Sequence, residues 1–275
     1  MQLLRPEQFQ PVLTTVPYRA KLLERYGVDH VLILPTTLAL LQLSPREFFE
    51  QVARERLAAK AIVEGFNFAF GHDREGTVDT LKALCAEASL GLILVPAEEL
   101  DGRPISSSRV RNALVQGQVR AAIELLGRPY QLSGVVGQGQ RRGQTLGFPT
   151  ANLEDIPTLI PGNGVYAVRV WHENQPWPGA ANIGPNPTFG EQAPKIEVHL
   201  IDFRGDLYGQ TLRVDFLERL RDTKPFAGPA ELMRQLQADV EQARRILSSA
   251  PSAERGTIPI GSSPAPGAQE PGGNP

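Results

Sequence analysis

The chain has 275 residues, which is room for two domains of ordinary size, and its hydrophobic content of 41% is enough for normal cores. A formal net charge of −2 excludes the basic footprint of a nucleic-acid-binding protein. The only cysteine, Cys85, excludes an internal disulfide and a cysteine-based metal cluster, and we expect a small buried side chain there. The N-terminus lacks the apolar core of a signal peptide, and no apolar run reaches the roughly 18 residues of a spanning helix. We therefore expect a cytoplasmic protein with neither nucleic acid nor a membrane as its partner.

Strands and helices alternate over residues 1–125. Short apolar runs of the kind that form buried parallel strands occur at residues 31–34, 61–63 and 92–95. Helical patterns lie between them, one of them at about residues 78–88 with Leu81 and Leu84 facing inward. This alternation predicts a Rossmann-like α/β domain with a parallel sheet.

The other helix of this region has a clear start signal. Ser44 is a typical N-cap, Pro45 follows at the first helical position, and Glu47 stands three residues beyond the cap. An apolar stripe should then follow at near-helical spacing, with Phe48, Val52 and Leu57 facing the core.

Residues 130–220 have a different pattern, with short β-rich stretches between Gly, Pro and Asn. A strand is expected at residues 132–136, and others at 164–171, 195–203 and 212–217. Together they predict a small β-barrel. Pro229 then opens a helix, which should pack on the barrel through an apolar stripe of Leu232, Leu236, Val240, Ala243 and Leu247. Residues 249–275 are rich in Pro, Gly, Ser and Ala and are expected to be a disordered tail.

A loop rich in glycine and arginine follows the strand at residues 132–136 and ends in the sequence Gly-Phe-Pro-Thr-Ala-Asn. Glycines allow a backbone to approach a phosphate, and arginine adds positive charge. The candidate phosphate-binding residues are Gly137, Gly139, Arg142, Gly143 and Gly147. Thr150 and Asn152 offer hard oxygen ligands of the kind that Mg²⁺ accepts beside substrate phosphates, and Pro149 stiffens the segment before them. Taken alone, the same run can also be an ordinary turn between strands.

Several ordered stretches resemble riboflavin kinase, the C-terminal half of the bacterial bifunctional riboflavin kinase/FAD synthetases. The matching stretches are residues 126–130, 147–152, 164–168, 182–189, 196–200, 206–209 and 220–221. The resemblance implies a small Greek-key barrel at residues 126–248, with ATP and riboflavin as substrates, Mg²⁺ as the metal and FMN as the product.

Site residues for this half follow from the same resemblance. Glu197 alternates with inward-facing apolar residues, so its pattern alone indicates an ordinary solvent-facing carboxylate. The resemblance instead implies that Glu197 is the general base that accepts the proton of the ribityl hydroxyl. It also implies that Thr150 and Asn152 hold ATP with Mg²⁺, and that Arg221, before a flap, faces the flavin. Phe189 could pack on the flavin ring or in the core.

Residues 1–125 resemble the FMN adenylyltransferase half of the same enzymes. The resemblance rests on residues 27–29, 64–71, 74, 76 and 105–111, and it implies that Asn67, Ser107, Ser108 and Arg111 contact ATP. Without it, the serines would be a plain helix cap. The family's opening His-x-Gly-His motif occurs nowhere in this sequence, so we expect an incomplete domain that lacks its first strand and transfers adenylyl groups poorly. Either the start codon was misplaced or this half is a remnant.

The leading hypothesis is therefore a riboflavin kinase that makes FMN from riboflavin and ATP, with FMN adenylyltransferase as the family's second activity. A non-catalytic flavin-binding or regulatory protein is the first alternative. A nucleotidyltransferase for another substrate is the second, but it does not account for the Gly-Phe-Pro-Thr-Ala-Asn segment.

Overall fold

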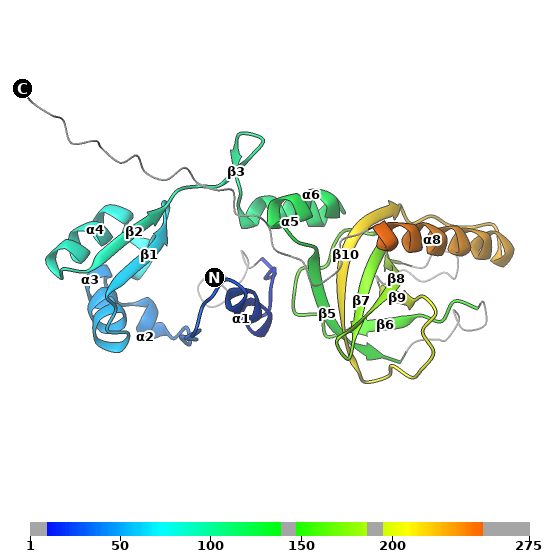
Figure 1. Ribbon diagram of the computed structural model, residues 1–275, viewed down its shortest axis with the longest axis horizontal. Coiled ribbons are helices and arrows are strands. Elements are labelled where there is room, and N and C mark those ends of the chain that lie inside the picture. Colours follow the sequence, from blue (N-terminus) through cyan, green and yellow to red (C-terminus); the bar gives the residue numbers. More distant parts are fainter. Residues whose placement is uncertain (1–9, 139–146, 186–194, 250–275) are drawn as a thin grey trace, which may run out of the picture. The chain divides into compact units, whose positions relative to one another are not determined.

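A computed structural model describes residues 10–138, 147–185 and 195–249 of the chain (Figure 1). The chain divides into two compact units, one formed by Val16–Ser106 and the other by the remaining residues, with Ser107–Pro275 as its larger part. The second unit begins well before residue 126, because the two helices that precede the barrel pack on it.

In the first unit, β1 (Ala61–Gly65) and β2 (Gly91–Val95) form a parallel two-stranded sheet. The helix between them, α4 (Val78–Glu87), begins at the N-cap Thr77 and packs its apolar face on the sheet. Leu81, Leu84 and Cys85 are buried against Ile62 and Leu92. The parallel pairing, the helix and the buried cysteine are all as predicted.

The predicted capping box is also confirmed at α3 (Pro45–Phe48). The Ser44 backbone N–H donates to Glu47 Oε2 over 2.8 Å, and the Glu47 N–H donates to Ser44 Oγ over 3.3 Å. The helix then continues as a π-helical segment, Phe49–Arg56. Because a π-helical turn is wider, the positions that face the core shift, and the predicted stripe is wrong at Leu57, which is 52% exposed. The buried residues of this segment are Phe49 and Val52, so the prediction is confirmed at Val52.

The strand predicted at residues 31–34 is not formed. These residues have no regular structure, and Val31, Leu32 and Ile33 are exposed. Among the described residues, β1 and β2 pair only with each other, so this apolar run has no neighbouring strand to bond with and gains no burial. The remaining elements of this unit are short: α1 (Val16–Glu24), α2 (Leu38–Leu41), a 3₁₀ turn at His72–Arg74, and a hairpin of β3 (Glu99–Leu100) and β4 (Arg103–Pro104).

The second unit contains the predicted barrel, which is closed and antiparallel throughout. Its strands are β5 (Tyr130–Gly137), β6 (Ala151–Glu154), β7 (Gly164–His172), β8 (Gln175–Gly184), β9 (Lys195–Leu200) and β10 (Thr211–Arg221). Their order around the barrel is β10-β5-β6-β9-β8-β7. Strands β7, β8 and β9 follow one another, and β6 lies beside β9, which is a Greek-key arrangement.

Alternate residues of each strand fill the barrel with apolar side chains. Leu132, Val168, Val198, Val214 and Phe216 are at most 1% exposed and belong to one core. The positions between them face outward, which is the period-two pattern of a strand.

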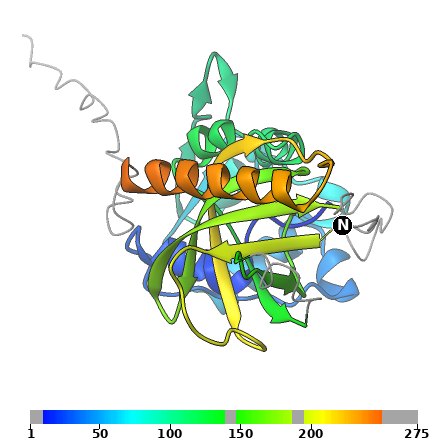
Figure 2. The same ribbon diagram turned by 90° about the vertical axis from the view of Figure 1, so that its right-hand side faces the viewer.

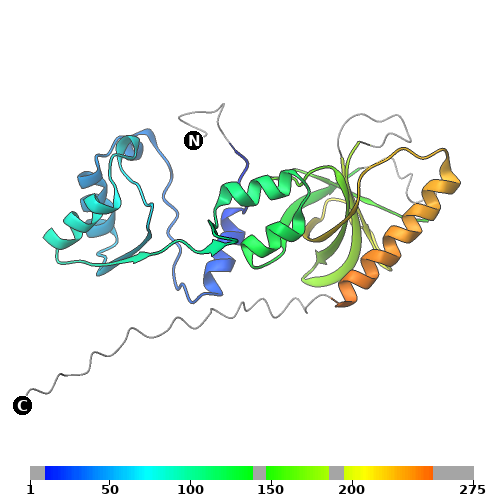
Figure 3. The ribbon, with the colours of Figure 1, turned by 90° about the horizontal axis from the view of Figure 1, so that it is seen from above.

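Three helices cover this barrel. The helices α5 (Ser107–Val115) and α6 (Val119–Leu126) lie side by side (Figure 3), and their Leu114 and Val119 are buried in the barrel's core cluster. The long helix α8 (Pro229–Ser249) lies across another side of the barrel (Figure 2). Its Ala243 packs with Ala167 and Ile201, as the predicted apolar stripe requires. The tail predicted at residues 249–275 lies outside the described residues, apart from Ser249.

Candidate functional site

Two predicted site residues stand opposite each other on neighbouring strands. Asn152 of β6 pairs with Glu197 of β9, and on its other side Asn152 pairs with Gly137 of β5. Directly opposite residues of antiparallel strands share one face, with Cβ atoms about 4.5–5.5 Å apart. The barrel therefore brings a candidate metal ligand and the candidate base together from sequence positions 45 residues apart.

The same row continues around the barrel. Glu197 pairs with Asn182 of β8, Asn182 with Val165 of β7, and Val165 with Arg221 of β10 beyond a β-bulge. Gly137, Asn152, Glu197 and Arg221 were all selected from sequence, and this register sets them in one row. Asn182 was not selected, although it lies within a stretch that carried the resemblance. Its signal is a polar residue between the inward-facing Ala181 and Ile183.

The polar members of this row face away from the barrel core. Both chain neighbours of Asn152, Glu197 and Asn182 are buried inside the barrel, whereas the three side chains themselves are half-buried on the outside. No hydrogen bond or ion pair joins the Glu197 carboxylate to another residue of the described ranges.

Thr150 lies just before β6, in a segment that contacts β9. Gly147 has a φ of +80°, a left-handed conformation that favours glycine, and it opens the segment. The rings of His199 and Phe148 meet edge to face at a centroid distance of 5.6 Å, and Nδ1 of His199 lies 2.8 Å from the carbonyl oxygen of Pro149. These contacts place an exposed Thr150 next to the strand that carries Glu197.

The predicted phosphate loop is described only at its ends. At Gly137, a Cβ atom would come within 2.4 Å of the Glu154 carboxylate, but this is the far end of a flexible, exposed side chain that can move aside, so the contact sets no strict steric requirement for glycine. Gly139, Arg142 and Gly143 lie outside the described residues, and so does Phe189.

Arg221 is engaged with α8. Its Nη2 lies 2.8 Å from Asp239 Oδ2, its Nε donates to both Asp239 oxygens, and its Nη1 donates to the Asp222 carbonyl. The guanidinium also lies over the Phe226 ring, 5.5 Å from its centroid. The expected contact of Arg221 with flavin stays a prediction, and the structure adds a second role, which is to attach the helix to the end of β10.

The four candidate residues of the adenylyltransferase half fall into both units. Asn67 is exposed in the turn after β1, whereas Ser107 and Ser108 open α5 and are exposed. Arg111 donates from Nε to the carbonyl oxygen of Pro11 over 3.1 Å. Their contacts with ATP also stay predictions.

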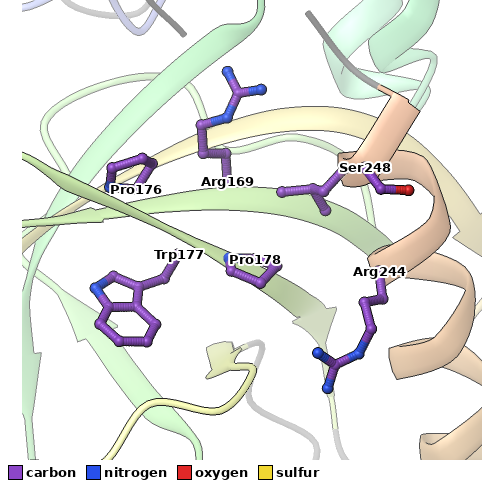
Figure 4. Close-up of a pocket in the computed structure, with 7 residues that line it drawn as sticks. Arg169, Pro176, Trp177, Pro178, Arg244 and Ser248 are labelled. Carbon is purple, nitrogen blue, oxygen red and sulfur yellow. The ribbon is translucent and has the colours of Figure 1, made fainter. Parts of the chain in front are cut away.

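A shallow pocket of about 300 Å³ lies elsewhere on the barrel's outer face, between β7, β8 and the end of α8 (Figure 4). It is lined by Arg169, Pro176, Trp177, Pro178, Arg244, Leu247 and Ser248. Arg244 is paired with Asp202 at 2.5 Å. The pocket contains no carboxylate among its lining residues and none of the predicted site residues.

Two further observations bear on the chemistry available. Within the described ranges, no group of three or more His, Cys, Asp or Glu side chains could hold a metal ion. No helix in those ranges is both long and apolar enough to cross a membrane.

Comparisons with known proteins identify the family. The riboflavin kinase family model matches residues 126–247, and the FAD synthetase model matches residues 1–109. The bifunctional riboflavin kinase/FMN adenylyltransferase of Pseudomonas fluorescens is 40% identical over 230 residues, which cover 83% of this chain and 73% of that protein. This chain belongs to the bifunctional riboflavin kinase/FMN adenylyltransferase family.

A second relative agrees with this assignment, and a solved structure has a similar fold. The family member from Bacillus subtilis (strain 168) is 32% identical over 249 residues, covering 89% of this chain and 78% of that protein. The crystal structure of a macrolide-efflux protein from Streptococcus pneumoniae aligns with a TM-score of 0.76 and 36% identity, over 84% of this chain and 75% of that one. The predicted family and fold class are confirmed: a parallel-sheet FAD synthetase region, followed by a six-stranded riboflavin kinase barrel with a C-terminal helix.

Proposed function

We propose that this chain transfers the γ-phosphoryl group of ATP to riboflavin, giving FMN and ADP. The observation that supports this most directly is the row of Asn152, Glu197 and Asn182 on the outer face of the barrel, inside the region that matches the riboflavin kinase model. A carboxylate between two carboxamides can accept a proton, bind a metal-bearing phosphate and hold a hydroxyl-rich chain within one short span.

Glu197 is the proposed general base. The terminal hydroxyl oxygen of the ribityl chain forms the new bond to the γ-phosphorus, the bond to the bridging oxygen breaks, and ADP leaves. The Glu197 carboxylate takes the hydroxyl proton, which contributes on the order of 10²–10⁴-fold to the rate. Positioning and charge neutralisation supply the larger part of catalysis in phosphoryl transfer.

Thr150 and Asn152 are the proposed protein ligands of Mg²⁺. Their oxygens are hard donors of the type that Mg²⁺ accepts when substrate phosphates and water complete its coordination. Both side chains lie on the outer side of the barrel, and neither has a hydrogen-bond partner among the described residues. When bound, the ion would neutralise charge on the transferring phosphoryl group.

The remaining proposed contacts divide into those with ATP on one side of Glu197 and those with riboflavin on the other. The backbone of the loop from Gly137 through Gly139, Arg142 and Gly143 to Gly147 is proposed to hold the ATP phosphates. On the other side, Asn182 is proposed to hydrogen-bond the ribityl chain, and Arg221 and Phe189 to contact the flavin. In the N-terminal half, Asn67, Ser107, Ser108 and Arg111 are the residues proposed to bind ATP for adenylyl transfer to FMN.

The decisive test is the Glu197→Gln variant. The amide keeps the size of the side chain but cannot accept the proton, so FMN formation should fall by about 10²–10⁴-fold while riboflavin still binds. Initial rates are measured with riboflavin, ATP and Mg²⁺, resolving riboflavin, FMN and FAD by chromatography. Binding is followed separately through quenching of flavin fluorescence.

The matched control is Glu218→Gln on the same barrel. Glu218 is a glutamate of β10 that pairs with Arg120 at 2.7 Å, so its loss removes an exposed ion pair and should leave the rate nearly unchanged. Equal FMN formation by wild type and Glu197→Gln would reject Glu197 as the base. Flavin binding by a wild-type protein that forms no FMN would favour a non-catalytic flavin-binding protein.

A further inference from the structure

The pairing between β6 and β9 is short, and it ends just before Thr150. It comprises two residue pairs, Ala151 with Val198 and Asn152 with Glu197. The next pair in register would join Thr150 to His199, but the ladder has ended there. Something other than the ladder must therefore hold Thr150 beside β9.

His199 provides that contact through its side chain. It lies two residues after Glu197, so both side chains are on the same outer face of β9. Its Nδ1 lies 2.8 Å from the carbonyl oxygen of Pro149. A carbonyl oxygen can only accept, so Nδ1 must carry the proton in this contact.

A second contact supports the same segment. The rings of Phe148 and His199 meet edge to face, 5.6 Å apart at an interplanar angle of 68°. Aromatic pairs with this geometry are favourable beyond their buried area. One histidine thus holds two consecutive residues, Phe148 and Pro149, directly before Thr150.

We propose that His199 is a positioning residue that holds the Phe148–Thr150 segment against β9 and so sets the Thr150 hydroxyl relative to the Glu197 carboxylate. This inference rests on the proposed function, in which Thr150 is a metal ligand and Glu197 the base. His199 itself touches neither the metal nor the transferred group. Its effect should therefore appear in the metal requirement more than in flavin binding.

The first test compares His199→Ala with His199→Asn. The asparagine amide nitrogen can take the place of Nδ1 and donate to the Pro149 carbonyl, whereas alanine cannot. We expect His199→Ala to raise the half-saturating Mg²⁺ concentration for FMN formation by about fivefold to a hundredfold, the range from one lost hydrogen bond to a displaced ligand. His199→Asn should restore most of this loss, and the dissociation constant of riboflavin should change little in either variant.

His172→Ala is the matched control. His172 of β7 also makes one side-chain hydrogen bond, with Gln210, and one edge-to-face ring contact, with Phe203 at 5.4 Å. Neither partner belongs to residues 148–152. Its loss should leave the Mg²⁺ requirement unchanged. That result would show that the effect of His199→Ala depends on where this histidine lies, and not on the loss of any histidine from the barrel.

A second readout does not depend on activity. Amide hydrogen exchange of residues 148–152 should be faster in His199→Ala than in wild type and close to wild type in His199→Asn. If wild type forms no FMN, the proposed function fails, and this exchange measurement still decides the positioning role. Unchanged exchange and unchanged Mg²⁺ dependence in His199→Ala would overturn it, and so would a defect that His199→Asn does not reduce.

If His199→Ala does not fold, His199→Gln replaces it. Glutamine carries its donor one atom farther along the side chain, so it should lose the contact that asparagine keeps. Equal behaviour of the Asn and Gln variants would contradict a specific hydrogen bond to Pro149.

Discussion

Asp215 is a buried carboxyl on the outer side of β10, where only 7% of the residue is exposed. Its oxygens accept hydrogen bonds from Gln131 Nε2 over 2.6 Å and from Trp171 Nε1 over 2.7 Å. Burial raises the pKa of Asp215 above its ordinary value, and these hydrogen bonds and two nearby arginines oppose the rise only in part.

A pH dependence follows from this raised pKa. Between the unfolded pKa, about 4, and the higher folded pKa, the folded protein binds more protons at this site than the unfolded chain. The stabilisation is therefore fully present below the unfolded pKa and is lost as pH rises through the folded pKa. The free energy of unfolding of wild type, relative to Asp215→Asn, should fall between pH 3 and pH 7. Both tryptophans lie on barrel strands, so denaturation followed by their fluorescence reports this unit.

Asp202→Asn is a control for which the pH dependence of stability has the opposite sign. The hydrogen bond from Arg244 lowers the pKa of Asp202, so its contribution is present above the unfolded pKa and is lost as pH falls through the folded one. A wild-type advantage over Asp215→Asn that grows toward neutral pH would contradict the inferred direction for Asp215.

Among the elements, α8 is attached to the barrel by an ion pair as well as by apolar packing. The side chains of Arg221 and Asp239 are 18% and 4% exposed, and three of the contacts between them are 3.1 Å or shorter from Nε and Nη2. Gln235 adds a hydrogen bond to Asp239 over 2.9 Å. The middle of the helix is thereby tied to the end of β10 at Arg221.

Removing one partner of this pair should be costly. We expect Asp239→Leu to lower the free energy of unfolding of the barrel by about 3–5 kcal/mol, because it leaves the Arg221 charge largely buried and unpaired. The double variant Arg221→Met with Asp239→Leu should recover much of that loss. Chemical denaturation followed by tryptophan fluorescence measures both, and a single variant as stable as wild type would show that the pair adds nothing.

Across the whole chain, the two regions differ in the candidate catalytic residues and motifs that they contain. The kinase region has Asn152, Glu197 and Asn182 on one face of a closed barrel. The Val16–Ser106 unit has a two-stranded sheet on which Val63 and Ile93 are each 59% exposed, and the sequence contains no His-x-Gly-His motif to stabilise a transferring nucleotide phosphate.

This difference predicts the products of the 275-residue polypeptide. With riboflavin, ATP and Mg²⁺ it should accumulate FMN and form little FAD, and supplying FMN directly should not increase FAD. Chromatography of the three flavins over time gives the result. A family member that carries the His-x-Gly-His motif is the positive control, and FAD formed by this polypeptide at a comparable rate would show that the motif is dispensable.

Local patterns in the sequence determined much of this protein. Alternation predicted four of the six barrel strands, β5, β7, β9 and β10, but not β6 or β8. Ser44 with Glu47 predicted a capped helix, and the stripe on α8 predicted its packing, because each depends on residues close together in the chain. The resemblance on seven stretches indicated the family, which the comparisons confirm.

What the tertiary structure alone decided involves residues far apart in the chain. Residues 31–34 have the composition of a strand, but a strand needs a neighbour, and sequence periodicity does not say whether one is present. Likewise, only the barrel register sets Asn182 and Asn152 on either side of Glu197. Only packing in three dimensions brings Arg221 to Asp239 and His199 to Pro149. Pairing between distant strands depends on how the sheet closes, and a local sequence pattern does not specify that closure.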